Sequence, residues 1–290
     1  MRVLITGAAG FIGRHIDKAL SKAGHHVIGL DAVLAHPGYA AGWVTADITR
    51  PLPKFNLDAV IHLAAVANPR ECDTDPTKAF NVNVNGTHQV LAMALMSGAK
   101  KVVFSSTAHV YGISPRYLPT DESHPLWLQN NYTLTKILGE QLCHLYYENH
   151  GLSYTALRLF NAYGLGQVRG YFIPDMIAKA RTGGFELKGA NTTKDFVWID
   201  DVARAFVLAL ETPFVGAVNI GTGVETQLGA IARQVAEAEG VPCGLTNAPD
   251  ATRMCAQYSR ATKVLGWQPT KSVSEGLHVI CDQAKAIAVR

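Results

Sequence analysis

A tyrosine and a lysine four residues apart are the residues of this chain best suited to proton transfer. Tyr132 and Lys136 lie in NNYTLTKILGEQL, within a helical pattern over 131–149. A spacing of four puts both side chains on the same face of a helix. A free phenol has a pKa of about 10, so tyrosine is a poor base at neutral pH unless its anion is stabilised. The Lys136 ammonium would stabilise that anion, which predicts Tyr132 as a general base.

A hydroxyl-rich segment supplies a candidate partner for this pair. The Y-x-x-x-K motif alone also fits a solvated helix face, so it does not establish catalysis by itself. The run KVVFSST at 101–107, however, reads as a strand that ends in hydroxyls. Parallel strands deliver the residues at their carboxyl ends to the ligand crevice. We therefore expect Thr107 to hydrogen-bond the same substrate oxygen as Tyr132.

Three glycines at a fixed spacing lie close to the first residue. Gly7, Gly10 and Gly13 belong to TGAAGFIG, between the apolar run RVLI and a helical pattern. In this context they would permit a tight turn, the close approach of a pyrophosphate and close packing of the helix on the sheet, respectively. The N–H groups at the helix start would face the phosphates. The alternative is an ordinary strand-to-helix turn.

An acidic residue favours NAD over NADP at such a turn. Asp31 ends the next apolar run, 18 residues after Gly13. A carboxylate at this place accepts hydrogen bonds from the adenine ribose and repels a 2′-phosphate. No arginine or lysine follows it in AVLAHPG. The glycines and Asp31 together therefore predict an NAD site.

The elements that must position these residues alternate between strand and helix. Apolar β-branched runs and helical patterns follow one another at 2–6, 13–23, 26–31, 43–48, 58–65, 78–96, 101–107, 131–149 and 153–160. This alternation predicts an α/β fold with a doubly wound parallel sheet, the Rossmann fold, covered by helices on both faces. We expect an NAD-binding domain over 1–164 and a smaller C-terminal substrate lobe mainly over 165–290, with 194–223 returning to the first domain.

Composition excludes several classes of protein. The 290 residues are 48% hydrophobic and carry a net charge of +3, which predicts no nucleic-acid partner. The five cysteines are scattered and no apolar run reaches the roughly 18 residues of a membrane helix, so we expect a cytoplasmic protein with reduced thiols and no membrane partner. No histidines and carboxylates stand at metal-ligand spacing, so we expect no metal site.

Several motifs, in order along nearly the whole chain, resemble one family. They are TGAAGFIG, ADI at 46–48, HLAA at 62–65, NVNGT at 83–87, FSSTAHVYG, YTLTK, LRLFNAYG, KDFVWIDDVARA and LGWQP. In this order they resemble the extended short-chain dehydrogenase/reductases, specifically the nucleotide-sugar epimerase/dehydratase branch and its sugar 4-epimerases. The separation of 25 positions from Thr107 to Tyr132 also suits that family.

The resemblance implies NAD as the cofactor and assigns positions to it. These positions lie in the glycine turn, at the ends of the following strands, in NVNGT and in the Tyr–Lys motif: Gly7, Gly10, Phe11, Ile12, Gly13, Asp31, Asp47, Ile48, Leu63, Ala64, Ala65, Asn83, Ser105, Tyr132 and Lys136. The catalytic residues that it implies are Thr107, Tyr132 and Lys136. Tyr132 would take a proton from a sugar hydroxyl while NAD accepts and later returns a hydride, through a transient 4-keto sugar.

The substrate implied is a nucleotide sugar, with a UDP- or dTDP-sugar expected. Positions that would contact it are Thr107, His109, Asn161, Arg169, Lys194 and Arg253. Asn161 would touch the diphosphate, and the arginines and lysine are candidate phosphate cations. The family often has arginine where Lys194 stands, and lysine loses the bidentate fork.

Two residues after Thr107 distinguish reactions within the branch. The 4,6-dehydratases of the family carry Asp-Glu there, and the sugar-acid decarboxylases carry a glutamate just before VYG. This chain has Ala108 and His109 instead. The absence of both carboxylates favours epimerisation at C4. The alternatives are an NAD(P)H-dependent keto-sugar reductase and a non-catalytic dinucleotide-binding sensor. His109 itself reads either as a group that titrates near the sugar or as a structural histidine.

The resemblance also implies an oligomer. In the family, the helices that correspond to 78–96 and 131–149 pair with their copies to make a four-helix interface. The second of these helices carries a broad apolar face. We therefore expect a homodimer through these two helices.

Overall fold

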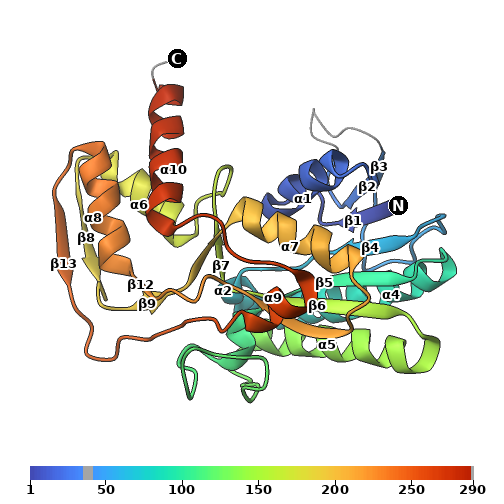
Figure 1. The fold of residues 1–290 in the computed structure, drawn as a ribbon. Coiled ribbons are helices and arrows are strands. Elements are labelled where there is room, and N and C mark those ends of the chain that lie inside the picture. The colour runs from blue at the N-terminus through green and yellow to red at the C-terminus, as the bar shows by residue number, and fades with distance from the viewer. Residues whose placement is uncertain (35–41, 289–290) are drawn as a thin grey trace.

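A single parallel sheet of seven strands forms the centre of the molecule in the computed structural model, which describes residues 1–34 and 42–288 (Figure 1). The strand order is β11-β6-β5-β4-β1-β2-β3, and every neighbouring pair is parallel. The strands are β1 (Arg2–Thr6), β2 (His26–Asp31), β3 (Trp43–Thr45), β4 (Ala59–His62), β5 (Lys101–Thr107), β6 (Ser153–Leu159) and β11 (Gly216–Ile220). The predicted α/β fold is confirmed.

The central strands are apolar because helices cover the sheet on both faces. All residues of β4 and β5 are buried, and such strands read as continuous apolar runs rather than as alternating ones. Along β1, Val3 and Ile5 belong to the core on one face while Leu4 belongs to the core on the other. The polar exceptions at the end of β5 belong to the site described below.

Two pairs of helices make the two layers (Figure 1). α1 (Phe11–Lys22) and α7 (Ile199–Glu211) pack on each other over one face. α4 (Gly86–Met96) and α5 (Asn131–His150) pack on each other over the opposite face. The chain runs from β1 to β2 on one side and crosses to β4 on the other, so the strand order reverses between β1 and β4. Ligands of such sheets bind outside the carboxyl ends of the strands at this reversal.

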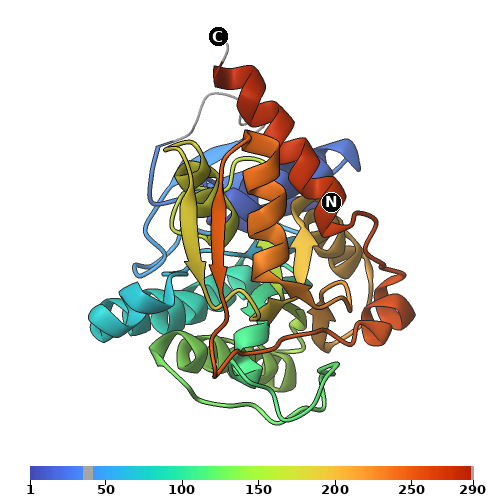
Figure 2. The ribbon, with the colours of Figure 1, turned by 90° about the vertical axis from the view of Figure 1, so that its left-hand side faces the viewer.

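A smaller region, on the left of Figure 1, follows β7 (Asn161–Tyr163). It contains α6 (Phe172–Ala180), α8 (Leu228–Glu239) and α10 (Val273–Ala288), and Figure 2 shows β8 (Phe185–Lys188) beside its parallel partner β13 (Cys243–Thr246). Two short pairings, β10 (Phe196–Trp198) with β7 and β12 (Thr226–Gln227) with β9 (Thr193–Lys194), join the regions. α9 (Ser259–Leu265) contacts β11. The strand β11 lies in the main sheet, whereas the division at residue 164 stays a prediction.

The structure departs from the predicted elements at two places. The helix expected over 78–96 is three elements, α3 (Pro76–Phe80), a π-helix (Asn81–Asn85) and α4, and it follows the short helix α2 (Pro69–Thr74). The strand expected over 43–48 ends at Thr45 because the Asp47 carboxylate accepts the backbone N–H of Thr49 at 2.9 Å and forms a turn. None of the described helices is long and apolar enough to span a bilayer.

Candidate active site

The turn between β1 and α1 brings two distant backbone segments together. Gly7 has a φ of 72°, in the left-handed region that favours glycine. A Cβ at Gly7 would lie 2.7 Å from the backbone nitrogen of Ala64, in the loop that follows β4. A Cβ at Gly13 would lie 2.5 Å from the carbonyl oxygen of Gly7. Gly7 thus permits the predicted tight turn, whereas Gly13 packs α1 on the turn itself rather than on the sheet.

The start of α1 is suited to a pyrophosphate. Its N-cap residue, Gly10, offers no side-chain cap, and the first N–H groups of a helix have no partner within the helix. A Cβ at Gly10 would meet only the Gly7 oxygen, at 3.1 Å, so this side of the turn is otherwise open. Phe11 and Ile12 supply the next two N–H groups. Donors at a helix N-terminus favour an anion, which fits the predicted dinucleotide.

Asp31 stands beside this turn at the carboxyl end of β2. Its Oδ2 accepts the backbone N–H of Ala9 at 3.0 Å, and its Oδ1 accepts that of Val33 at 3.4 Å. The carboxylate is half-buried. It is therefore fixed beside the glycine turn, and its contact with the ribose of NAD stays a prediction.

The remaining positions expected to line the cofactor lie in loops that the fold holds firmly. Leu63 and Ala64 are tied to Thr6, because the N–H of Leu63 donates to its carbonyl and the N–H of Ala64 to its hydroxyl at 3.3 Å. Asn83, in the π-helix, accepts the N–H of Val66 at 2.7 Å and donates to the Val66 carbonyl at 3.0 Å.

Asn83 also donates to the hydroxyl of Thr135 on α5 at 3.0 Å. Its amide is thus fully engaged by protein, so Asn83 braces the loop after β4 against α5. Ile48 is buried, and a Cβ at Gly86 would lie 2.7 Å from its Cδ1, which makes it part of the core. Asp47 is exposed, and the hydrogen bond from the Thr49 backbone holds the pKa of its carboxyl below its ordinary value. Direct contacts of all the expected positions with the cofactor, those of Ala65, Asn83, Asp47 and Ile48 included, stay predictions.

The three expected catalytic residues are brought together at the carboxyl end of β5. A capping box of Asn130 and Thr133 starts α5, which places Tyr132 in its first turn. The Tyr132 hydroxyl lies near the Thr107 side chain, which acts to lower the pKa of the phenol. The Nζ of Lys136 donates to the carbonyl of Ser105 at 2.8 Å and lies 5.9 Å from the centre of the Tyr132 ring.

Burial disfavours the charged forms of both Tyr132 and Lys136. It raises the pKa of the Tyr132 phenol well above its ordinary value, although the Thr107 side chain opposes the change. It lowers the pKa of the Lys136 ammonium to about 8. The phenol is therefore neutral until further positive charge stabilises its anion, which a bound oxidised nicotinamide would supply.

The neighbours of Tyr132 were missed in the sequence analysis. Its ring packs on a small cluster that includes Val66 and Cys72. The phenol of Tyr171, the N-cap residue of α6, also acts electrostatically on Tyr132 and so faces it from the smaller region. No pattern in the turn-rich sequence around 171 indicates this approach, because it depends on how α6 packs on α8.

His109 and Lys194 lie near each other on the substrate side. Burial, followed by the charge of Lys194, lowers the pKa of His109 to about 4. His109 is therefore neutral at physiological pH and does not titrate there, which argues against the first of its two sequence interpretations. Burial also lowers the pKa of the Lys194 ammonium, and no carboxylate within the described ranges forms an ion pair with it. Lys194 thus remains available for an anionic group.

The other expected substrate contacts already have partners in the protein. The Asn161 amide donates to the Asp195 carbonyl at 2.9 Å. Arg253 is exposed, and its Nε donates to Glu225 at 2.8 Å. Arg169 is also exposed and lies 3.9 Å from Asp175. These three contacts with a diphosphate stay predictions, and the two arginines would have to leave their carboxylates to make them.

Within residues 1–34 and 42–288, no group of three or more histidines, cysteines and carboxylates is placed to hold a metal ion. Cys72, Cys143, Cys243 and Cys255 are free thiols. The geometry of the site is thus that of a dinucleotide turn beside a phenol, a hydroxyl and an ammonium.

Comparison with known proteins decides the family. The model of the NAD-dependent epimerase/dehydratase family matches residues 3–221, which is more than half of the chain. The chain belongs to this family. The resemblance deduced from the ordered motifs is therefore confirmed, and NAD is the cofactor of this epimerase/dehydratase family member.

Some relatives of this protein are named as epimerases and others as decarboxylases. It is 34% identical over 304 residues to the UDP-glucose 4-epimerase of Mycolicibacterium smegmatis, covering 96% of each chain. It is 30% identical over 302 residues to UDP-glucuronic acid decarboxylase 6 of Arabidopsis thaliana, covering 96% of this chain and 87% of that one. At these identities the protein is a nucleotide-sugar enzyme. The names of these two relatives do not by themselves distinguish epimerisation from decarboxylation.

The fold is shared with solved structures. The UDP-glucose 4-epimerase of Thermotoga maritima, solved with UDP-glucose, superposes with a TM-score of 0.90 at 27% identity, covering 99% of this chain and 100% of that one. The smaller C-terminal region is included in this match. The shared fold therefore extends over both regions of this protein.

Proposed function

We propose that the protein is an NAD-dependent nucleotide-sugar epimerase that inverts C4 through a transient 4-keto sugar. The observation that carries the proposal is the meeting of Tyr132, Thr107 and Lys136 at the carboxyl end of β5. Tyr132 accepts the proton of the 4-hydroxyl and returns it, Thr107 orients the same oxygen, and Lys136 stabilises the phenolate. NAD, when bound, takes up the hydride from C4 and gives it back.

Decarboxylation is the reaction to be distinguished, because some relatives bear that name. In this chain the residue just before Val110, Tyr111 and Gly112 is His109, a neutral imidazole, rather than a glutamate. The groups that act on Tyr132 include Thr107, Tyr171 and Cys72 but no carboxylate among the described residues. The absence of an acidic group beside the base supports epimerisation.

The substrate proposed is a UDP- or dTDP-sugar. The UDP-sugars in the names of the relatives support the first. Lys194, which pairs with no carboxylate of the described residues, supports an anionic group such as a diphosphate. The experiment is to release and identify the cofactor, then to incubate the protein with UDP-, dTDP- and GDP-sugars. Product epimers without net NADH change are expected, whereas stoichiometric NADH consumption with a keto-sugar would identify a reductase instead.

Asp31 should set the choice of dinucleotide. In Asp31→Asn we expect the affinity for NADP relative to NAD to rise about tenfold, because the change removes a charge that repels the 2′-phosphate while an amide oxygen still accepts the Ala9 N–H. Binding titrations with both dinucleotides measure the ratio. Asp58→Asn is the matched control, since Asp58 accepts the N–H of Arg2 at the amino ends of the strands, away from the turn. An unchanged ratio in Asp31→Asn would contradict the assignment.

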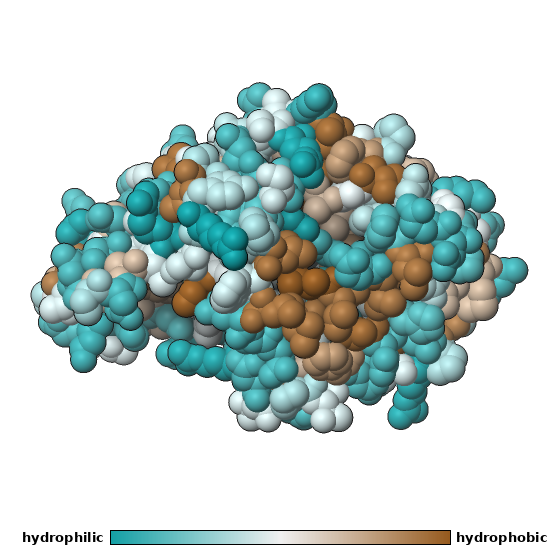
Figure 3. Space-filling view, turned by 90° about the horizontal axis from the view of Figure 1, so that it is seen from below, coloured by the Kyte–Doolittle hydropathy of each residue, from teal (hydrophilic) through white to brown (hydrophobic). Residues whose placement is uncertain are grey.

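The dimer is also a proposal, made through the apolar face of α5 and α4. Figure 3, seen from below, shows a broad hydrophobic patch on the side where α5 lies. Met96 on α4 and Leu145 on α5 are among the exposed large hydrophobic residues, each about half exposed. Such a patch marks an interaction site, and the occupant that we propose is a second copy of the chain.

A charge on this face should separate the copies. Leu145→Glu is expected to convert the dimer to a monomer, measured by light scattering after gel filtration, because it buries a charge in the interface. Val279→Glu, at an exposed position of α10 in the smaller region, is the control that should leave the mass unchanged. A monomeric wild-type protein would refute the proposed dimer.

A further inference from the structure

Lys136 and Glu140 occupy positions i and i+4 of α5, yet they are not paired. At this spacing, lysine and glutamate normally attract each other on a helix surface. Both side chains are buried here, where an opposite charge acts more strongly than in water. Instead, the Lys136 ammonium donates to the carbonyl of Ser105, and the Glu140 carboxylate is held elsewhere.

Arg158 on β6 holds that carboxylate with both arms of its guanidinium. Its Nε donates to Oε1 of Glu140 at 2.9 Å and its Nη2 to Oε2 at 2.6 Å. The hydroxyl of Ser106 donates to Oε1 as well, at 2.5 Å. A bidentate, charge-assisted pair of this kind is strong and directional. Both oxygens of Glu140 are thus engaged by Arg158 and Ser106.

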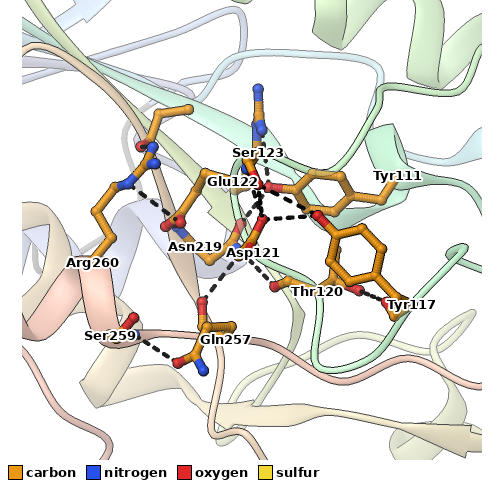
Figure 4. A network of polar contacts seen from close by, with 12 residues as sticks. Tyr111, Tyr117, Thr120, Asp121, Glu122, Ser123, Asn219, Gln257, Ser259 and Arg260 are labelled. Carbon is orange, nitrogen blue, oxygen red and sulfur yellow. Dashed lines mark hydrogen bonds and ion pairs between the residues drawn. The ribbon is translucent and has the colours of Figure 1, made fainter.

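Arg158 is itself fixed from behind. Its Nη1 donates to the hydroxyl of Tyr111 at 2.9 Å, and that hydroxyl donates to Oδ1 of Asn219 at 2.7 Å. Figure 4 shows how Tyr111, Asn219 and Glu122 meet, with Arg260 at the outer end of the same network. The guanidinium therefore cannot turn away from Glu140 without breaking this network.

The close approach of α5 to β5 makes the separation possible. A Cβ at Gly139 would lie 2.4 Å from the ring of Phe104, so only glycine lets the helix sit this near the strand. The next two residues of β5, Ser105 and Ser106, each bind one of these two charged side chains of α5. The Ser105 carbonyl receives Lys136, and the Ser106 hydroxyl binds Glu140.

We propose that Arg158 is a positioning residue for the proton transfer: together with Ser106 it keeps Glu140 from pairing with Lys136, so that the ammonium remains available to the Tyr132 anion. The effect of this arrangement on catalysis rests on the proposed function, in which Tyr132 is the base. The separation of the two charges itself does not depend on which sugar the enzyme uses.

The other titratable groups that act on Lys136 do not replace a carboxylate. Burial, then the charge of Lys136, lowers the pKa of His62 on β4 to about 3, which keeps it neutral. Burial raises the pKa of the thiols of Cys72 on α2 and Cys143 on α5, so both stay protonated. Of the described groups that act on Lys136, Glu140 is thus the one carboxylate.

The test is the titration midpoint of Lys136 in the holoenzyme, followed by NMR of ε-carbon-labelled lysine and assigned with Lys136→Met. In Arg158→Met the freed carboxylate should raise the midpoint by about one pH unit or more. In Glu140→Gln the midpoint should fall or stay. In the double variant the charges balance again, so the midpoint should return to the wild-type value.

Turnover should follow the same pattern. Arg158→Met is expected to lose about tenfold at neutral pH, with the acid limb of the pH profile moved upward, because a paired ammonium stabilises the phenolate less. The double variant should recover both. The control is Arg181→Met, which removes the same charge outside the network, at a residue 3.8 Å from Glu239 in the smaller region, and should move neither quantity.

An unshifted Lys136 midpoint in Arg158→Met, or a double variant that does not restore it, would overturn the inference. If Arg158→Met fails to fold because Glu140 is left unpaired, the double variant decides. A wild-type midpoint and turnover then support the role, and a shifted midpoint or lost turnover refutes it. Failure of the wild-type enzyme to epimerise any sugar would refute the proposed function, while the midpoints could still be measured.

Discussion

Tyr132→Phe is expected to lower turnover with the nucleotide sugar about 10³-fold and to leave bound NAD and thermal stability nearly unchanged. A positioned general base contributes factors of this size. The substitution removes only the hydroxyl near Thr107, while the ring keeps its contacts with the cluster around Cys72. Steady-state kinetics with the substrate from the sugar panel, together with the cofactor content of the purified variant, measure the effect.

Tyr147→Phe is the matched control for this substitution. Tyr147 lies on the same helix, α5, with more than a third of its side chain exposed, and removal of its hydroxyl should leave turnover at the wild-type level. If Tyr132→Phe is as active as this control, Tyr132 is not the base. A wild-type protein that binds NAD but epimerises none of the sugars would favour the dinucleotide sensor.

Gly7→Ala should abolish NAD binding and destabilise the protein by about 3 kcal/mol or more. Two costs add: a left-handed φ of 72° costs a residue with a Cβ about 1–2 kcal/mol, and overpacking costs a further 1–3 kcal/mol or so. The overpacking arises because the new Cβ would lie 2.7 Å from the backbone of Ala64, which cannot rotate away as a side chain can. Moving that loop would deform the cofactor cradle.

Gly24→Ala separates these two costs. Gly24 has a φ of 82°, but no atom lies within 4 Å of the Cβ that alanine would add. It should therefore lose only about 1 kcal/mol and keep its NAD. Urea unfolding and the dinucleotide content after purification compare the two variants. Equal stabilities and equal NAD contents would show that the contact between the turn and the Ala64 loop is unimportant.

The catalytic pair illustrates why burial has to be combined with selective pairing. Of the described groups that act on the Lys136 ammonium, Glu140 is the one carboxylate, and burial lowers the pKa of Lys136 to about 8. A nearby carboxylate would stabilise the ammonium but would also neutralise its field at Tyr132. The arrangement of Ser106, Glu140 and Arg158 keeps one charged pair complete and leaves Lys136 without a carboxylate.

Local sequence determined the sheet and the chemistry of its edge. Apolar runs and helical patterns need only neighbouring residues to be recognised, so the strands around Val3, Val60 and Val103 and the helix from 131 were predicted with ends within a few residues. The glycine turn, Asp31 and the Tyr132–Lys136 spacing are local too. Their expected places at the carboxyl edge of the sheet follow from the rule for parallel strands.

Long-range packing decided what sequence patterns could not show. The helix expected over 78–96 is interrupted by a π-helix that contains Asn83. Asn83 forms hydrogen bonds there with Val66 and Thr135, which lie 17 and 52 residues away in the sequence. Likewise, the i, i+4 spacing of Lys136 and Glu140 predicts attraction, but Arg158 arrives from β6 and takes the carboxylate. Spacing along a helix fixes which side chains share a face. Whether those side chains meet depends on competing partners that only the folded chain brings near, because a buried charge pairs with the donor whose geometry satisfies it best.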